Sequence, residues 1–263
     1  MPHPDSTLLR SLNTAIDDGL LAALGEGRRV SLVHFPDTPS PGDPARWLGT
    51  RIALRRLGVR VAYQCLPETL SAEAVRAAEG PLLLSSPVDA GVLASVDVPV
   101  VPLFDLKMPP LALALGALPR LGAVDVDVLW HCGEGAPPVG VTSRVVSWSS
   151  PDFGHNPKQV VAARASAELR SRASRDPEFA RRTWRALSAT FVPLAKAHVQ
   201  HALTVLGGGG ALVTDDLDGH LLALLAGIPH VVLGELAGGV PDSCLVRTAS
   251  DADVAAELAL ELL

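Results

Sequence analysis

The spacing of apolar residues along the chain switches between the period of an amphipathic helix and the short apolar runs typical of buried strands. A helical spacing starts at a Ser6 or Thr7 cap and continues to Leu24, where Gly25 and its neighbours stop it. Residues 29–35 then form an apolar run that predicts a buried strand. The alternation of the two patterns indicates an α/β fold.

The next segment completes a predicted β-α-β unit. Asp43 has the side chain of an N-cap and Pro44 suits the first helical position, so we expect a helix over residues 46–57. Gly58 ends this helix, and residues 59–63 form the following strand. Further apolar runs, which alternate with helices or loops as a mostly parallel sheet requires, lie at 81–84, 98–104, 126–130 and 144–148. We assign all of these strands to an N-terminal domain.

Residues 149–157 combine Pro, Gly, Asn and Ser and are interpreted as a crossing between two domains. The predicted domains are residues 1–150, on the acceptor side, and residues 151–263, on the donor side. The second domain is expected to contain helices at 158–174, 177–206 and 219–226, strands at 211–214, 230–233 and 244–246, and a terminal helix from Asp251. The predicted architecture is two Rossmann-like lobes with mostly parallel sheets and a cleft between their strand ends.

Composition narrows the possible partners. The formal net charge of -6 and the pattern of Lys and Arg on helical segments argue against nucleic acid. Three widely spaced cysteines indicate a reduced, cytoplasmic protein, and we expect neither a signal peptide nor a membrane span. The glycines at 207–210 precede a strand, whereas a phosphate loop opens a helix. We therefore expect no cofactor.

Two segments of the sequence resemble the polysaccharide pyruvyl transferases. The first has a Gly-Asp pair in a turn, a Trp-x-Gly step and an Arg-Arg-x-Gly ending, at Gly42, Asp43, Trp47, Gly49, Arg55, Arg56 and Gly58. The second has a Thr-Asp step, a retained histidine and an Ile-Pro-His strand start, at Thr214, Asp215, His220, Ile228, Pro229 and His230. The resemblance implies a GT-B-like fold and transfer of a pyruvyl group to a glycan. It is poor over residues 66–157, where 130–133 replace a donor-binding segment of the family.

The resemblance also supplies candidate site residues. Its motif places Asp216, Asp218 and His220 at the positions of catalytic groups. The residues that it implies for substrate binding are Gly42, Asp43, Trp47, Asp215 and Gly219. Taken alone, Asp43 is equally well explained as a helix cap, and Trp47 is better explained as core or cleft wall.

The family places an Arg and a His where this chain has Asp216 and Asp218. Phosphoenolpyruvate carries a phosphate and a carboxylate, so it requires cations rather than acids at these positions. We therefore expect a divergent transferase that acts on a small molecule, glycan or other polyhydroxylated acceptor, with altered or lost phosphoenolpyruvate chemistry. The alternatives are a non-catalytic partner of an intact paralogue, and an enzyme of specialised metabolism for an amine substrate. A homodimer or a hetero-oligomer with that paralogue is compatible with these readings.

Three interpretations of the acidic cluster stay open at this stage. Asp215, Asp216, Asp218 and His220 have the ligand chemistry of a metal site, although no metal is assigned. The same acids could hold a cationic or polyhydroxylated ligand. They could also be helix caps that need no ligand.

Overall fold

The computed structural model describes residues 3–33, 40–85, 87–133, 135–148, 157–236 and 241–263. Within these ranges the strands form two sheets, in the orders β2-β1-β3-β4 and β6-β5-β7-β8-β9, and all neighbouring strands are parallel. The first sheet contains β1 (Arg29–Val33), β2 (Arg60–Cys65), β3 (Leu82–Leu84) and β4 (Val100–Pro102). The second contains β5 (Val126–His131), β6 (Ser143–Val145), β7 (Gly209–Thr214), β8 (His230–Leu233) and β9 (Val246–Ala249). The predicted α/β class with parallel sheets is confirmed.

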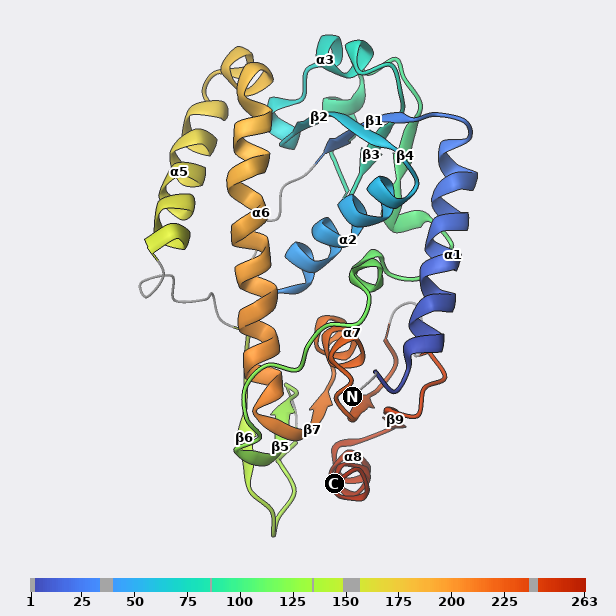
Figure 1. The fold of residues 1–263 in the computed structure, drawn as a ribbon, viewed down its shortest axis with the longest axis vertical. Helices are drawn as coiled ribbons and strands as arrows, with labels where there is room; N and C mark the ends of the chain where they lie inside the picture. The colour runs from blue at the N-terminus through green and yellow to red at the C-terminus, as the bar shows by residue number, and fades with distance from the viewer. Residues whose placement is uncertain (1–2, 34–39, 86, 134, 149–156, 237–240) are drawn as a thin grey trace.

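Helices surround both sheets (Figure 1). The helices are α1 (Ser6–Leu24), α2 (Gly42–Arg56), α3 (Ala72–Ala77), α4 (Ala90–Leu93), α5 (Pro157–Ala173), α6 (Pro177–Gly207), α7 (Leu217–Ala226) and α8 (Ala252–Glu261), with short 3-10 turns at η1 (Pro67–Thr69), η2 (Leu103–Asp105) and η3 (Leu111–Leu115). The predicted first helix, the two long helices after residue 157 and the terminal helix capped by Asp251 are confirmed. Among the described residues, no helix has the length and apolarity needed to cross a membrane.

Three strand predictions and two cap predictions are wrong. The N-cap of α1 is Asp5 rather than Ser6 or Thr7. Residues 126–130 and 144–148 were expected in the first sheet, but β5 and β6 join the second, where Leu129 pairs with Leu212 in parallel register. A boundary at residue 150 would therefore cut the second sheet, and the expected crossing at 149–156 lies outside the described residues. The strand expected at 244–246 is instead β9, which starts at Val246. Asp43 lies inside the first turn of α2, whose N-cap is Pro41.

One hydrophobic core joins the two sheets. Its main cluster of buried residues includes Leu32 and Leu83 from the first sheet and Leu212 and Val232 from the second. Helix α6 packs against α2 and β2 near one end and against α7 and β7 near the other. With 31 residues, this helix is the longest described element and runs beside both sheets, with Pro193 in its interior (Figure 1).

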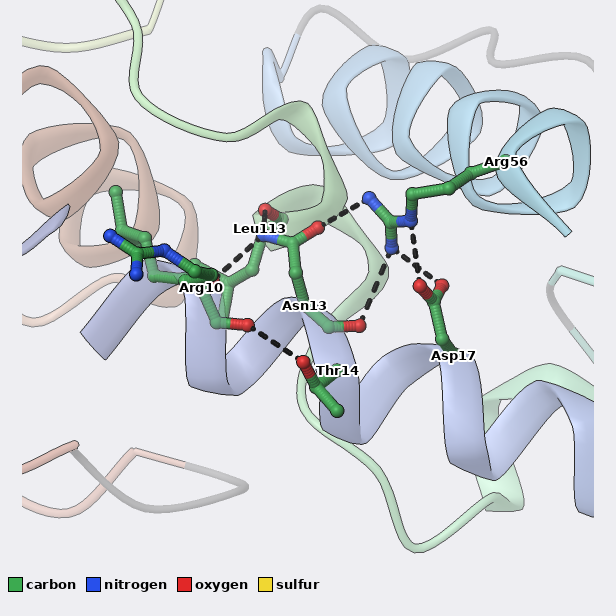
Figure 2. A network of polar contacts seen from close by, with 7 residues as sticks. Arg10, Asn13, Thr14, Asp17, Arg56 and Leu113 are labelled. Atoms are coloured by element: carbon green, nitrogen blue, oxygen red, sulfur yellow. Dashed lines mark hydrogen bonds and ion pairs between the residues drawn. The ribbon is translucent and has the colours of Figure 1, made fainter. Parts of the chain in front are cut away.

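A polar network fixes α1 to the end of α2 and to η3 (Figure 2). Arg56 donates to both carboxylate oxygens of Asp17, over 2.6 and 2.7 Å, and to Asn13 Oδ1 over 2.7 Å. Asn13 in turn donates to the carbonyl oxygen of Leu113 over 3.1 Å. A planar guanidinium suits this two-pronged contact. The network sets the position of α2, whose other end reaches the candidate site.

The glycine in the Trp-x-Gly step of α2 permits close packing against η3. A Cβ atom on Gly49 would lie 1.9 Å from the carbonyl oxygen of Leu111, which is backbone and cannot rotate away. Gly49→Ala should therefore lower the free energy of unfolding by about 1–3 kcal/mol, measured by urea denaturation.

Gly133→Ala is the matched control, because its Cβ would meet nothing closer than Asp215 Oδ2 at 3.6 Å. Equal stability of the Gly49→Ala and Gly133→Ala proteins would contradict the packing interpretation.

Candidate functional site

The strand orders place a topological switch point in each sheet. In the first sheet β1 lies between β2 and β3, and in the second β5 lies between β6 and β7. Consecutive connections leave such a strand in opposite directions, which opens a crevice beyond its carboxyl end. His131 ends β5, and Asp215 follows β7 directly. The resemblance-derived residues at 215–220 and the loop before α2 therefore both lie at carboxyl ends, as the sequence predicted.

The loops from the two sheets touch at Asp218. The Ser40 hydroxyl donates a hydrogen bond to the Asp218 carboxylate, and Arg46 Nη1 lies 3.7 Å from Asp218 Oδ1. Gly42 packs on the same carboxylate, since any Cβ there would overlap its oxygens at 1.8 Å. The absence of a side chain at Gly42 thus allows the Asp218 carboxylate of α7 to approach the backbone of α2 closely. The sequence predicted that Gly42 and the 215–220 motif face each other across a cleft. In the structure the two segments are in direct contact at Asp218.

The Asp218 carboxylate is largely enclosed by this junction, with its side chain 12% exposed. Burial raises the pKa of Asp218, and the Ser40 hydroxyl and Arg46 act in the opposite direction. Arg46 also forms an ion pair with Asp43, three positions earlier, where the sequence analysis predicted a helix cap. Asp43 is therefore an ion-pair partner inside α2.

Asp216 is the N-cap of α7. Its Oδ2 accepts a hydrogen bond from the Gly219 amide over 3.0 Å, the geometry that stabilises a helix start. The same oxygen accepts from Trp148 Nε1 over 2.7 Å. A Cβ on Gly219 would lie 2.7 Å from Thr214 Oγ1, so Gly219 allows the first turn of α7 to pack on β7. The cap interpretation accounts for Asp216 and the packing accounts for Gly219.

Asp215 points to a different neighbour. Its Oδ2 accepts a hydrogen bond from the Gly133 amide over 2.8 Å, which ties the loop after β5 to the loop after β7. Asp215 is exposed to solvent. Burial and the Asp215 charge raise the pKa of Cys132 to about 12, so this cysteine is a thiol at neutral pH. Asp215 is the most accessible acid of the motif.

His131 is a site residue that the resemblance did not indicate. It is half-buried at the end of β5, its Nδ1 lies 3.2 Å from Thr214 Oγ1, and its ring stacks obliquely on Trp148 at 4.5 Å between centroids. Burial lowers the pKa of His131, against the opposing charges of Asp216 and Asp215. A polar residue at the end of a buried apolar run was the sequence signal that could have identified it.

His220 lies in the core rather than in the crevice. Its exposed fraction is 0%, as is that of His230. His230 Nδ1 lies 2.8 Å from the Ile228 carbonyl oxygen and must donate to it, so its Nε2 accepts from His220 Nδ1 over 2.8 Å. His220 Nε2 then carries a lone pair and has no hydrogen-bond partner among the described residues. The structure thus places His220 in the core beside His230, and the catalytic role that the resemblance implies for it stays a prediction.

Trp47 also belongs to the core. Its side chain is 2% exposed, packs edge-on against Phe191 with centroids 6.1 Å apart, and is covered by the Arg51 guanidinium at 4.9 Å. Arg51 belongs to α2 and Phe191 to α6. The core interpretation of Trp47 therefore fits the structure, and substrate stacking does not.

The three acids of the motif diverge toward Gly133, Trp148 and Ser40. Among the described residues, no group of three or more His, Cys, Asp or Glu side chains is arranged to hold a metal ion. Metal ligands must converge on one point, which these side chains do not do. The metal interpretation has no support in this geometry.

Comparison of the chain with protein-family models gives no match, and comparison with curated proteins gives none either. The pyruvyl transferase resemblance therefore stays a prediction from the motifs alone.

The cap on α7 can be tested by removing its acceptor. Asp216→Ala should lower the free energy of unfolding by about 1 kcal/mol, because the Gly219 amide loses its partner. Asp216→Asn should lose less, since an amide oxygen also caps. Asp251→Ala removes a comparable cap from α8 and is the matched control for stability. Urea denaturation followed by tryptophan fluorescence measures all three, and wild-type stability of Asp216→Ala would refute the capping role.

The histidine pair predicts a loss of stability in acid. Burial lowers the pKa of His220 to about 3 and that of His230 to about 4, whereas an unfolded histidine titrates near about 6.5. The unfolded chain therefore binds more protons below pH 6.5, and stability falls as pH falls toward the folded pKa values. Two such groups contribute a slope of about 2.7 kcal/mol per pH unit at most, and one contributes about 1.4.

His220→Leu should reduce this slope between pH 6 and pH 4.5 while lowering stability at every pH, as measured by urea denaturation across the series. An unchanged slope in the variant would show that the pair is not the source of the acid sensitivity.

Proposed function

We propose that this chain is a divergent, GT-B-like relative of the polysaccharide pyruvyl transferases that binds a polyhydroxylated or amine-bearing small molecule and has lost phosphoenolpyruvate chemistry. The binding site is the crevice at the carboxyl end of β5 and β7, here called the acidic crevice and defined by His131, Trp148, Asp215 and Asp216. Support for a GT-B-like arrangement comes from the contact between the carboxyl-end loops of the two parallel sheets at Asp218.

The proposal rests on the acids at the start of α7, which are Asp216 in the acidic crevice and Asp218 at the junction with Ser40. Asp216 and Asp218 occupy the positions where the resemblance implies an Arg and a His, and both are fixed by hydrogen bonds to Trp148 and Ser40. Arg46 lies close by but is already paired with Asp43 and Asp218. A trianionic enol ester would meet net negative charge, whereas an ammonium or hydroxyl group would find acceptors.

The chemistry open to the acidic crevice is proton transfer and hydrogen bonding to hydroxyl or amine groups. The lowered pKa of His131 keeps its imidazole neutral at pH 7, the form that accepts a proton. Asp215 is exposed and can accept a hydrogen bond from a ligand hydroxyl or ammonium. The Trp148 ring, stacked on His131, offers an apolar wall of the kind that packs on a sugar face. We assign His131 as the candidate general base and Asp215 as the candidate ligand-orienting acid.

A non-catalytic partner of an intact paralogue is the second candidate. It is favoured by the burial of His220 and Trp47, two residues of the resembling motifs that here serve the core. Size-exclusion chromatography with a genomic neighbour that retains the basic motif would reveal a stable complex in that case.

The ligand class is tested by calorimetry and saturation-transfer NMR with glucosamine, methyl glucoside and phosphoenolpyruvate. Glucosamine should bind more tightly than methyl glucoside, and phosphoenolpyruvate should bind weakest, because the acidic crevice attracts an ammonium and repels an anion. The double variant Asp215→Asn/Asp216→Asn should weaken glucosamine binding about tenfold or more while it keeps the α7 cap.

Asp253→Asn is the control, since this acid is exposed on α8 and is not one of the residues that define the acidic crevice. Micromolar affinity for phosphoenolpyruvate would overturn the proposal. Loss of glucosamine binding equally in the Asp253→Asn protein would show that net charge rather than the crevice is responsible.

A further inference from the structure

Helix α6 borders a continuous groove on the side facing α2 and β2. Three adjoining depressions make up this groove, with volumes of about 280, 360 and 280 Å³ in order along α6. The first two share Arg51, Val61 and Val192, and the last two share Leu48, Ile52 and Lys196. We call this surface the α6 groove. It is lined by residues of α2 and α6, two helices that contact each other.

One half of the α6 groove is strongly basic. The cations that line its first two depressions are Arg51, Arg55, Arg60, Arg185 and Lys196. No Asp or Glu is among the described residues that line these depressions. The whole chain carries a formal net charge of -6, so such a concentration of positive charge is opposite in sign to the protein as a whole. A concave surface of one sign attracts ligands of the other sign.

Arg51 is the fixed centre of this basic half. Its Nη1 donates to Ser188 Oγ over 2.7 Å and to Gln64 Oε1 over 3.3 Å, and its guanidinium covers the Trp47 ring at 4.9 Å. Burial lowers the pKa of Arg51, and the charge of Arg55 acts in the same direction. A half-buried cation with a cationic neighbour is costly unless an anion accompanies it. The groove therefore has a preorganised guanidinium in need of a counter-charge.

The other half of the α6 groove is apolar. Its depression lies between α2, α6 and the segment after η3, and its lining includes Leu115, Leu118, Leu121, Val199 and Leu203. Lys196 stands at the junction with the basic half, because it lines both depressions. From Lys196 to Leu203 the helix rises by about 10 Å, close to the length of an eight-carbon chain. The groove thus has a cationic end and an apolar end, and the apolar end is about as long as an eight-carbon chain.

We propose that the α6 groove binds an anionic amphiphile, a phosphate monoester whose head group lies on Arg51, Arg55 and Lys196 and whose alkyl chain lies along the apolar half. Guanidinium groups bind phosphate oxygens in pairs, and lysine adds a point charge. The site goes beyond the proposed function, since its lining shares no residue with the acidic crevice and has the opposite charge. Its failure would leave the proposal for the acidic crevice unaffected.

The test is calorimetric titration of the full chain with alkyl phosphates below their critical micelle concentrations. Hexyl, octyl and decyl phosphate should bind with affinities that rise about fourfold for each methylene buried. Inorganic phosphate should bind at least tenfold more weakly than octyl phosphate, and neutral octyl glucoside should show no saturable binding. This pattern distinguishes an amphiphile site from a site for free phosphate.

The double variant Arg55→Gln/Lys196→Gln should weaken octyl phosphate binding at least tenfold with an unchanged melting temperature, because both side chains are exposed. Arg10→Gln/Arg28→Gln is the matched control, since it removes two exposed cations outside the groove. An equal loss in the control would overturn the proposal. So would affinity that does not change with chain length, or binding of octyl glucoside equal to that of octyl phosphate.

Discussion

The contact between Asp218 and the loop before α2 sets the relation of the two sheets. One carboxylate from the start of α7 meets the Ser40 hydroxyl and packs on Gly42, where no side chain would fit. Because each partner follows a strand of a different sheet, this contact joins the carboxyl ends of both sheets at one place. It accounts for the glycine at the start of α2 and for the serine two positions before it.

The junction also separates two surfaces of opposite charge. On one side, Asp215 and Asp216 face the crevice beyond β5 and β7, together with a neutral imidazole. The α6 groove, in contrast, is lined by arginines and a lysine. Beneath the groove, the Trp47 ring is buried against Arg51 and Phe191. A protein that segregates charge in this way can present distinct chemistry on its two faces without placing unlike ligands near each other.

Sequence patterns predicted the helices and most strands because apolar periodicity and caps are local properties. Asp251 and Asp216 show this, since a capping side chain bonds an amide three residues away. The prediction for β5 is wrong because an apolar run contains no information about which strand it pairs with. The partner of β5 is β7, which lies far along the chain. For the same reason, local patterns did not identify which histidine lies at the candidate site. His220 matched a motif yet lies buried on His230, whereas His131 matched no motif and reaches the crevice.

Helix α6 passes beside both sheets and carries a proline in its interior. A proline has no amide hydrogen, and Pro193 therefore leaves the fourth carbonyl before it without its helical partner. The helix is weakest in bending at that position, between Val192 and Lys196 of the groove. Because Val192 and Lys196 lie on either side of Pro193 and both line the groove, a molecule bound there would span the point at which the helical hydrogen-bond ladder is interrupted.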